Sequence, residues 1–373
     1  MYGAESDEAR DLAPICQAMN PLVSILIPAH NAEKWIADTI HSAVVQTWQR
    51  KEIIVVDDGS SDGTSEVARR FASKEVKVIS TENQGAAAAR NHALQSCQGD
   101  YIQWLDADDL LAPDKIELQL AGLRETDGKR TLLSSAWAPF SYRPKHARFV
   151  PTSLWQDLTP IEWFVKKMGE NLYMQTATWL TSRELTQAAG PWNVHLLSDD
   201  DVEYFCRVLL ASERIRFVPD AKVFYRITPS SRLSYVGTSD KKKDALVLSL
   251  KLQIEHARLV EDSDRVRKAC LTCLKNRLGE FHPERPDLVA ELQTLIEQLG
   301  DAPALPRLRP KYAWMEPMFG WGIAKSAQIV LPRVKASWVR WWDGIMYKFE
   351  NRRALLGQLP DPKPIAQEDP KWR

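Results

Sequence analysis

The chain has 373 residues, 44% of them hydrophobic, and its 49 basic residues balance its 49 acidic ones. This composition is typical of a folded globular protein of about two domains, and the zero net charge argues against a general nucleic-acid binder. No apolar run approaches the roughly 18 residues of a membrane span, and the acidic start lacks the apolar stretch of a secretory signal. Five widely spaced cysteines are not typical of a disulfide framework. We therefore expect a cytoplasmic protein without a nucleic-acid partner.

From residue 21 to about 137, short apolar runs rich in β-branched residues alternate with stretches of helical periodicity. The strands are expected at 23–28, 52–57, 76–80, 101–105 and 131–137. The helices are expected at 33–48, from 62 onward, at 85–95 and at 113–125. Strands that alternate with helices of this length predict a parallel sheet covered on both faces.

The rest of the chain is less regular up to about residue 230 and mainly helical after about 238. Its first part is expected to contain helices near 160–169, 182–189 and 200–211, and strands at 176–180, 215–218 and 222–227. Its second part is expected to contain a long helical segment at 240–277 and a shorter one at 286–299. A linker with Pro303, Pro306 and Pro310 then precedes a Trp-rich helix over about 332–353 and a polar tail.

Acidic residues gather where expected strands end. The clusters are Asp57-Asp58, then Asp106, Asp108 and Asp109, and further on 199–201. Ligands bind at the carboxyl ends of parallel strands, and carboxylates gathered there repel one another unless a cation lies between them. Mg²⁺ and Mn²⁺ favour such oxygen ligands together with phosphates. Solvated turns and helix caps are the alternative interpretation, but three clusters favour a metal–phosphate site.

Three stretches carry a resemblance to the family 2 inverting glycosyltransferases of the GT-A fold. They read VSILIPAHNAEKWIADTIHSAVVQTWQRKEIIVVDDGSSDGT, NQGAAAARNHAL and GDYIQWLDADDLLAPDKI, in this order. The resemblance is close over about 21–125 and weaker to about 235. It implies an α/β GT-A fold with a mostly parallel central sheet, here followed by a helical C-terminal region. It also implies a nucleotide-sugar donor, a UDP-sugar by preference, a divalent cofactor (Mn²⁺ or Mg²⁺), and transfer with inversion.

The resemblance assigns roles to six residues of these stretches. Pro28 and His30 would border the nucleobase, Asp58 would hydrogen-bond it, Arg90 would lie near the diphosphate, Asp106 would face the ribose, and Asp108 would bind the metal. It assigns no role to Asp109. An ion pair on the helix surface is the alternative interpretation of Arg90.

The third acidic cluster supplies the remaining role. The stretch LSDDDVEYFCRVL resembles the family's E-D-x-D-aromatic-aromatic-x-R segment, so that Asp201 matches the catalytic carboxylate and Asp200 its acidic companion. An acceptor hydroxyl is a poor nucleophile and needs a base within hydrogen-bond reach. A second carboxylate and a partly dry cleft would raise the proton affinity of that base. Adjacent residues face different ways, and we expect Asp201 to be the base; capping of a helix by one of the three aspartates is the alternative.

One position departs from the family pattern. Many relatives carry a histidine shortly after a Tyr-Arg pair, where it helps to hold the metal or the diphosphate, whereas here Tyr225-Arg226 is followed by Thr228. Metal binding would then depend on Asp108, phosphates and water, and Arg226 or Arg232 could compensate by charge.

The Trp-rich helix has an apolar stripe beside six basic residues. The stripe contains Leu331, Val334, Trp338, Trp341, Trp342, Ile345 and Phe349. The basic residues are Arg333, Lys335, Arg340, Lys348, Arg352 and Arg353. This combination is typical of a helix at a membrane interface, here the inner leaflet on the cytoplasmic face. The alternative is that the stripe packs on the catalytic domain or on a second subunit of a homo-oligomer.

These observations predict five consecutive parts. They are a flexible segment at 1–20, a nucleotide-sugar-binding half at 21–137, an acceptor-binding half with the catalytic base at 138–237, a helical extension at 238–302, and the linker, Trp-rich helix and tail at 303–373. The expected activity is transfer of a sugar to a glycan or lipid-linked acceptor in cell-surface glycan or polysaccharide assembly. A nucleotidyltransferase usually has a Gly-rich phosphate loop near its first strand, and SILIPAHNAEKW contains none. A non-catalytic scaffold protein would not need both the D-x-D and the Asp200-Asp201 carboxylates.

Overall fold

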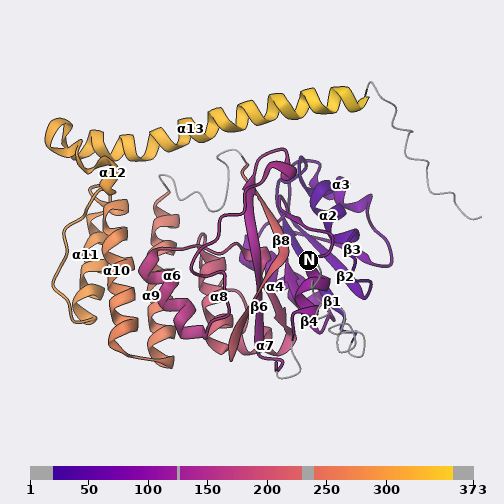
Figure 1. Cartoon of the computed structure of the whole chain (residues 1–373), viewed down its shortest axis with the longest axis horizontal. Coiled ribbons are helices and arrows are strands. Elements are labelled where there is room, and N and C mark those ends of the chain that lie inside the picture. Colours follow the sequence, from indigo (N-terminus) through magenta and orange to yellow (C-terminus); the bar gives the residue numbers. More distant parts are fainter. Residues whose placement is uncertain (1–19, 124–126, 229–238, 356–373) are drawn as a thin grey trace, which may run out of the picture. The chain divides into compact units, whose positions relative to one another are not determined.

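A curled eight-stranded sheet forms the centre of the computed structural model, which describes residues 20–123, 127–228 and 239–355 (Figure 1). The strand order is β3-β2-β1-β4-β7-β6-β8-β5. The strands are β1 (Val23–Ala29), β2 (Lys51–Asp58), β3 (Val76–Thr81), β4 (Tyr101–Trp104), β5 (Leu110–Leu111), β6 (Thr131–Phe140), β7 (Leu180–Ser182) and β8 (Arg214–Arg226). Strands β3, β2, β1 and β4 are parallel neighbours, as are β6 and β8. Strand β7 pairs antiparallel with both β4 and β6, and β5 pairs antiparallel with β8.

Alternate residues of the parallel strands pack on opposite faces of the sheet, as the pleat of a strand requires. On one face, Ile25 and Ile53 pack with Ile36 and Ile40 of helix α2 (Ile36–Val44). On the other face, the core contains Leu26, Ile54 and Val56 with the alanines of helix α4 (Ala86–Ser96). The sheet is therefore covered on both faces, which confirms the prediction from the strand–helix alternation.

In the part of the chain that the structure describes, eight further α-helices lie between residues 64 and 298, some between the strands in the sequence and the last three after β8. They are α3 (Thr64–Arg69), α5 (Lys115–Ala121), α6 (Pro160–Glu170), α7 (Arg183–Ala189), α8 (Asp200–Ala211), α9 (Asp240–Val260), α10 (Asp264–Phe281) and α11 (Pro286–Gln298). Apolar residues of α6, α8, α9 and α10 belong to the same core as the α4 face of the sheet. The helical extension is thus continuous with the core of the sheet.

Several predicted elements differ from the structure. The expected strand at 176–180 is a 3₁₀ turn (Thr176–Thr178) followed by β7, because the side chain of Gln175 accepts a hydrogen bond from the backbone N–H of Ala177 and closes the turn. The two strands expected at 215–218 and 222–227 are one strand, β8. Its pairing with β6 jumps from Val218 to Lys222, so the turn-forming residues between them bulge out instead of ending the strand.

Two helix predictions also need correction. The helix expected at 240–277 is broken at 261–263 between α9 and α10. The Trp-rich helix expected from 332 is the second half of α13 (Glu316–Leu355), which continues through Pro332. A proline is usually placed in the first turn of a helix, where its missing N–H costs nothing, and this position therefore resembled a helix start.

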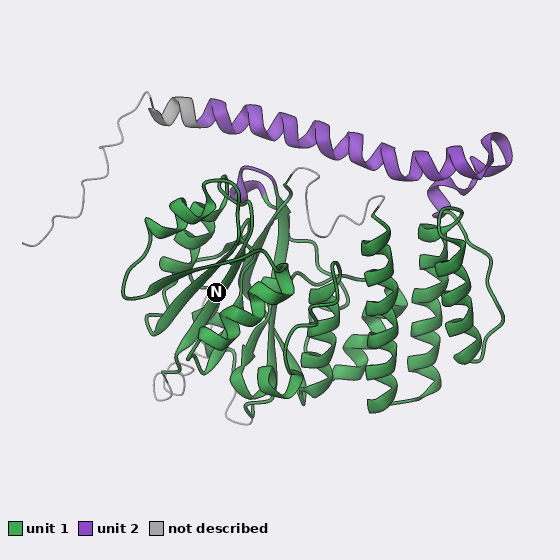
Figure 2. Ribbon diagram, turned by 180° about the vertical axis from the view of Figure 1, so that it is seen from behind, with its two compact units in different colours: residues 1–140, 147–308 green, residues 141–146, 309–373 purple. Residues whose placement is uncertain are grey.

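The chain divides into two compact units, which Figure 2 colours separately. Unit 1 contains residues up to 140 and 147–308, and unit 2 contains 141–146 and the residues from 309 onward. Within unit 2, α12 (Pro310–Ala313) precedes α13, whose first turn ends at Gly320 with a φ of 78° that other residues rarely adopt. Among the helices of the described residues, none is both long and apolar enough to cross a membrane.

Candidate active site

The end of β2 is joined to the start of α4 by Asp58. The two carboxylate oxygens of this buried residue accept hydrogen bonds from the backbone N–H groups of Gln84, at 2.9 Å, and Gly85, at 2.8 Å. Gly85 has a φ of 93°, so the chain can turn there and present both N–H groups to one carboxylate. His30 follows β1, and its Nδ1–H donates to the carbonyl oxygen of Asp58 at 2.8 Å. Pro28, half-buried on β1, lies beside Val56 of β2 in the strand register.

The turn after β4 is anchored by Asp109. This fully buried carboxylate accepts hydrogen bonds from Gln175 Nε2, at 2.5 Å, and from the backbone N–H of Arg226, at 2.7 Å. Burial raises the pKa of Asp109 well above its ordinary value, and the charges of Asp108 and Asp106 add to this effect. Arg226 Nε also donates to the carbonyl oxygen of Asp108 at 2.7 Å. Asp106 and Asp108 are left as the half-buried carboxylates of a turn that is fixed on both sides.

Arg90 connects this turn to the third acidic cluster. This residue of α4 is buried, with only 7% of its side chain exposed. Arg90 Nη2 donates to Asp106 Oδ1 at 2.9 Å, and Arg90 Nη1 donates to Asp200 Oδ2 at 2.6 Å. The planar guanidinium therefore holds a strand-end carboxylate and a carboxylate at the start of α8 at a fixed separation. The interpretation of Arg90 as a helix-surface ion pair is wrong, because the guanidinium is buried and its pair with Asp200 lies inside the fold.

Asp201 has surroundings different from those of Asp200. Its carboxylate accepts a hydrogen bond from Thr176 Oγ1 at 3.1 Å, and the residue lines a small cavity that is partly open to solvent. The other lining residues are mainly aromatic and apolar: Trp163, Phe164, Lys167, Tyr173, Met174, Trp179, Val202, Phe205, Cys206, Leu209 and Gln253. Burial raises the pKa of Asp201 to about 7, with further contributions from the charges of Asp200 and Asp199. A carboxylate with such a pKa is able to accept a proton near neutral pH.

An aromatic stack fixes Arg90 and α8 together. The guanidinium of Arg90 lies 4.4 Å from the ring centroid of Trp192, and the Trp192 ring stacks on Tyr204 of α8 with centroids 4.0 Å apart and planes 7° apart. The guanidinium of Arg207 also lies over the Tyr204 ring, 5.4 Å from its centroid. Each such contact contributes about 0.5–2 kcal/mol. The stack therefore helps to fix the orientation of the Arg90 guanidinium.

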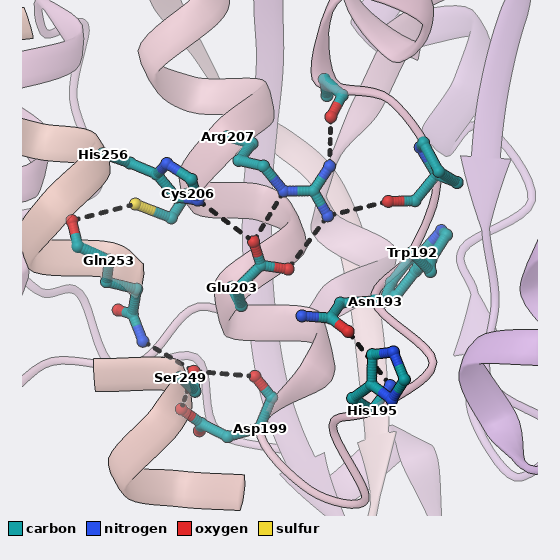
Figure 3. Close-up of polar contacts among 12 residues, drawn as sticks. Trp192, Asn193, His195, Asp199, Glu203, Cys206, Arg207, Ser249, Gln253 and His256 are labelled. Carbon is teal, nitrogen blue, oxygen red and sulfur yellow. Dashed lines mark hydrogen bonds and ion pairs between the residues drawn. The ribbon is translucent and has the colours of Figure 1, made fainter. Parts of the chain in front are cut away.

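Helix α8 is also tied to α9 through Glu203 (Figure 3). This residue is 2% exposed and accepts two hydrogen bonds from Arg207, at 2.6 Å and 2.9 Å. His256 Nε2 of α9 lies 3.4 Å from Glu203 Oε1, and Ser249 Oγ of α9 donates to Asp199 Oδ2 at 2.8 Å. Asp199 precedes α8 with a φ of 60° and makes no capping hydrogen bond with its side chain, so the capping alternative does not describe it.

A divalent metal would find few protein ligands here. Among the described residues, no three His, Cys, Asp or Glu side chains are grouped so that they could hold a metal ion. Mg²⁺ and Mn²⁺ commonly bind through one or two carboxylates and complete their coordination with substrate phosphates and water. The half-buried pair Asp106 and Asp108 fits that mode of binding. Arg226 Nη2 donates to Asp38 at 3.0 Å while its Nε donates to the carbonyl oxygen of Asp108, so its charge lies beside this turn. Arg232 lies outside the described residues.

Direct contacts join five of the predicted residues in two groups: His30 with Asp58, and Asp106 and Asp200 with Arg90. Sequence reasoning missed Thr176 and Trp192. Trp192 follows Gly190-Pro191, seven residues before the acidic cluster begins at Asp199, and a Gly-Pro pair indicates an ordered turn that here carries an aromatic ring. No pattern around Thr176 indicates its position, because the contact with Asp201 depends on the 3₁₀ turn.

Comparison with known proteins places the first part of the site, from Pro28 to Asp109, within one family match, whereas Asp200 and Asp201 lie beyond it. Residues 24–152 match the family model described as glycosyl transferase family 2. Over 103 residues the chain is 45% identical to an uncharacterized glycosyltransferase of Haemophilus influenzae, covering 27% of this chain and 41% of the relative. Over 108 residues it is 43% identical to the putative teichuronic acid biosynthesis glycosyltransferase TuaG of Bacillus subtilis, covering 28% and 43%. The chain thus aligns with less than half the length of these curated relatives.

A solved structure extends the likeness beyond the family domain. S. aureus TarS 1-349, in complex with UDP, superposes with a TM-score of 0.59 over 82% of this chain and 90% of that chain, at 19% identity. At this identity the likeness concerns the fold. The predicted α/β GT-A fold, with a mostly parallel central sheet and C-terminal helices, is confirmed.

Proposed function

We propose that this chain, which carries a glycosyl transferase family 2 domain over residues 24–152, transfers a sugar from a nucleoside-diphosphate sugar to an acceptor hydroxyl with inversion. The observation that carries the proposal is the Arg90 bridge. It fixes Asp106, at the end of a parallel strand, to Asp200, whose neighbour Asp201 lines a cavity. A donor-binding edge and a base on the acceptor side are thereby held in one rigid arrangement.

The donor would lie along the carboxyl ends of β1, β2 and β4. Pro28, His30 and Asp58 would contact the base, and Asp106 would contact the ribose. S. aureus TarS has been solved with UDP and with UDP-GlcNAc, which supports a UDP-sugar as the first donor to test. Asp108 would hold a divalent metal, Mn²⁺ or Mg²⁺, whose charge offsets that of the departing diphosphate. The buried charge of Arg90 acts in the same direction.

The acceptor would lie on the cavity side of Asp201. In the transfer step, Asp201 accepts the proton of the acceptor hydroxyl, and the hydroxyl oxygen bonds to the anomeric carbon of the sugar. The bond from that carbon to the diphosphate breaks on the opposite face, which inverts the configuration. Thr176 holds the Asp201 carboxylate in place, and Asp200 is paired with Arg90. Two carboxylates with separate partners fit this division of roles better than a paired acid and base for hydrolysis.

The acceptor class we propose is a glycan or lipid-linked glycan of the cell surface. The name of TuaG, a teichuronic acid biosynthesis enzyme, supports a polysaccharide product. A nucleotidyltransferase is the second candidate on the same kind of sheet, but it would release pyrophosphate and not a nucleoside diphosphate. A non-catalytic nucleotide-sugar-binding protein would leave unexplained why the pKa of Asp201 is raised to about 7 beside a cavity.

A donor screen tests the proposal. The full chain is incubated with UDP-, GDP- and dTDP-sugars, with and without Mn²⁺ or Mg²⁺, and release of the nucleoside diphosphate is measured in the presence of a glycan acceptor mixture. We expect release from one nucleotide class only and only with metal. Release of pyrophosphate would favour the nucleotidyltransferase, and donor binding without turnover by any acceptor would favour the non-catalytic protein.

A further inference from the structure

Helix α13 of unit 2 has one face made of large apolar side chains that are open to solvent. We call it the Trp face; its members are Leu331, Val334, Trp338, Trp341, Trp342, Ile345 and Phe349, each 40–65% exposed. At 3.6 residues per turn they fall within an arc of about 100°. Exposed apolar patches of this kind indicate an interaction surface, because isolated exposed apolar residues are normal but a continuous stripe of them is not.

The opposite face of α13 is the one that holds unit 2 together. Arg143 donates to Asp343 Oδ1 at 2.7 Å and to Glu350 Oε1 at 2.8 Å, and Lys145 Nζ lies 2.9 Å from Glu350 Oε2. The ring of Tyr142 packs beside Tyr347, with centroids 5.8 Å apart. These partners on α13 lie on the side away from the Trp face when projected on a helical wheel. With these contacts made, the side chains of the Trp face from Leu331 to Ile345 remain 40–65% exposed.

The charge of unit 2 identifies the kind of partner. Residues 141–146 and 309–350 contain nine Lys or Arg against three Asp or Glu, in a chain whose overall net charge is zero. Two of those three acidic residues, Asp343 and Glu350, are paired with Arg143 and Lys145. On a helical wheel, Lys335 and Lys348 lie next to the two edges of the Trp face. The surface is thus apolar and rich in tryptophan at its centre and positive around it.

A lipid bilayer with anionic headgroups matches both properties. Tryptophan rings prefer the headgroup level of a bilayer, and each basic residue near an anionic surface contributes about 1 kcal/mol. The described part of α13 carries five Lys or Arg between 325 and 348, so it would lie in the plane of the interface and not cross it. We infer that the Trp face of α13 docks this protein on the surface of an anionic membrane. This inference does not depend on the proposed transfer reaction, although it suits a lipid-linked acceptor.

Vesicle binding tests the inference on the full chain. Co-sedimentation is measured with phosphatidylcholine vesicles containing 0, 15 or 30% phosphatidylglycerol, at low and high salt. We expect binding that rises with the anionic fraction and falls with salt. The double variant Trp338→Ser/Trp341→Ser should reduce binding at least tenfold, and Lys335→Glu/Lys348→Glu should abolish the dependence on phosphatidylglycerol.

A matched control comes from two apolar residues exposed elsewhere. Leu259 and Leu305 of unit 1 are 81% and 79% exposed, and Leu259→Ser/Leu305→Ser should bind vesicles as the unaltered chain does. Circular dichroism and nucleoside diphosphate release with a soluble acceptor should be unchanged in all three variants, which separates this inference from the proposed function. Absence of binding at 30% phosphatidylglycerol, or binding that the tryptophan variant retains, overturns the inference. A dimer that the tryptophan variant converts to a monomer, without vesicle binding by the unaltered chain, assigns the Trp face to a second copy instead.

Discussion

Arg90 Nη1 donates to Asp200 Oδ2 over 2.6 Å, in a pair whose two side chains are 7% and 12% exposed. Asp200 is therefore paired with a cation, whereas the adjacent Asp201 accepts a hydrogen bond from the neutral hydroxyl of Thr176. Two neighbouring carboxylates thus have different surroundings and different chemistry. The predictions below follow from that difference.

The first prediction concerns the Arg90 pair itself. Arg90→Met leaves Asp200 buried without its cation, and the free energy of unfolding should fall by about 3–5 kcal/mol, as is usual when one partner of a buried ion pair is removed. Urea unfolding followed by circular dichroism measures this. The double variant Arg90→Met/Asp200→Asn should recover a large part of the loss. Additive losses in the two single variants and the double variant would contradict the coupling.

The second prediction concerns pH and activity. Burial raises the pKa of Asp201 to about 7, so the base is protonated and inactive below that pH. The logarithm of kcat/KM should rise with pH at slope one and level off above about pH 7. Asp199 is one of the charges that raise this pKa, and Asp199→Asn should move the limb to lower pH. If the acidic limb of the pH profile does not move in Asp199→Asn, or if activity does not depend on pH between 5.5 and 8, Asp201 is not the group whose titration controls the rate.

The third prediction concerns pH and stability. The pKa of Asp201 is raised in the fold from 3.8 to about 7, so its contribution to stability is fully present below pH 3.8 and is lost as the pH rises through 7. Asp201→Asn removes the penalty of the buried charge. The gain in unfolding free energy should therefore be larger at pH 8 than at pH 5, by about 2–3 kcal/mol. Equal effects of the substitution at the two pH values would be inconsistent with a raised pKa.

Some of the residues in these predictions could be located from sequence patterns, and others could not. Strands β1 to β4 are apolar runs that end in turn residues. The positions of Asp58, Asp106 and Asp108 at the strand ends could be predicted because these residues come at the ends of those runs. Asp201 could be placed from its motif. Local patterns of this kind depend only on neighbours along the chain.

The parts that the sequence did not indicate depend on distant contacts. Thr176 reaches Asp201 through a turn that the side chain of Gln175 closes, although a threonine-rich run resembles a strand. Trp192 supports Arg90 across 102 residues of chain. Strand β8 continues past its bulge because β6 pairs with both of its parts. Such interactions become visible only once the tertiary structure brings the partners together.

The fourth prediction concerns the metal. Asp108 is a half-buried residue of a turn that Asp109 and Arg226 anchor, so Asp108→Ala should leave the fold intact. The variant should lose the increase in donor affinity that Mn²⁺ gives. Calorimetric titration of the donor with and without Mn²⁺ measures this increase, and Asp114→Ala, at an exposed turn of unit 1, serves as the control. The same increase in Asp108→Ala as in the control would exclude Asp108 as the ligand.

The central claim is that Asp201 is the base of a sugar transfer, and single-turnover rates of Asp201→Asn with a saturating donor and acceptor test it most directly. Asparagine keeps the shape and the contact with Thr176 but accepts no proton, so the rate should fall by about 10²- to 10⁴-fold. The donor dissociation constant should stay within about twofold of the unaltered protein, because Asp201 is assigned to the acceptor side. A rate within about threefold of the unaltered protein, or a loss of donor binding equal to the loss of rate, would contradict this role.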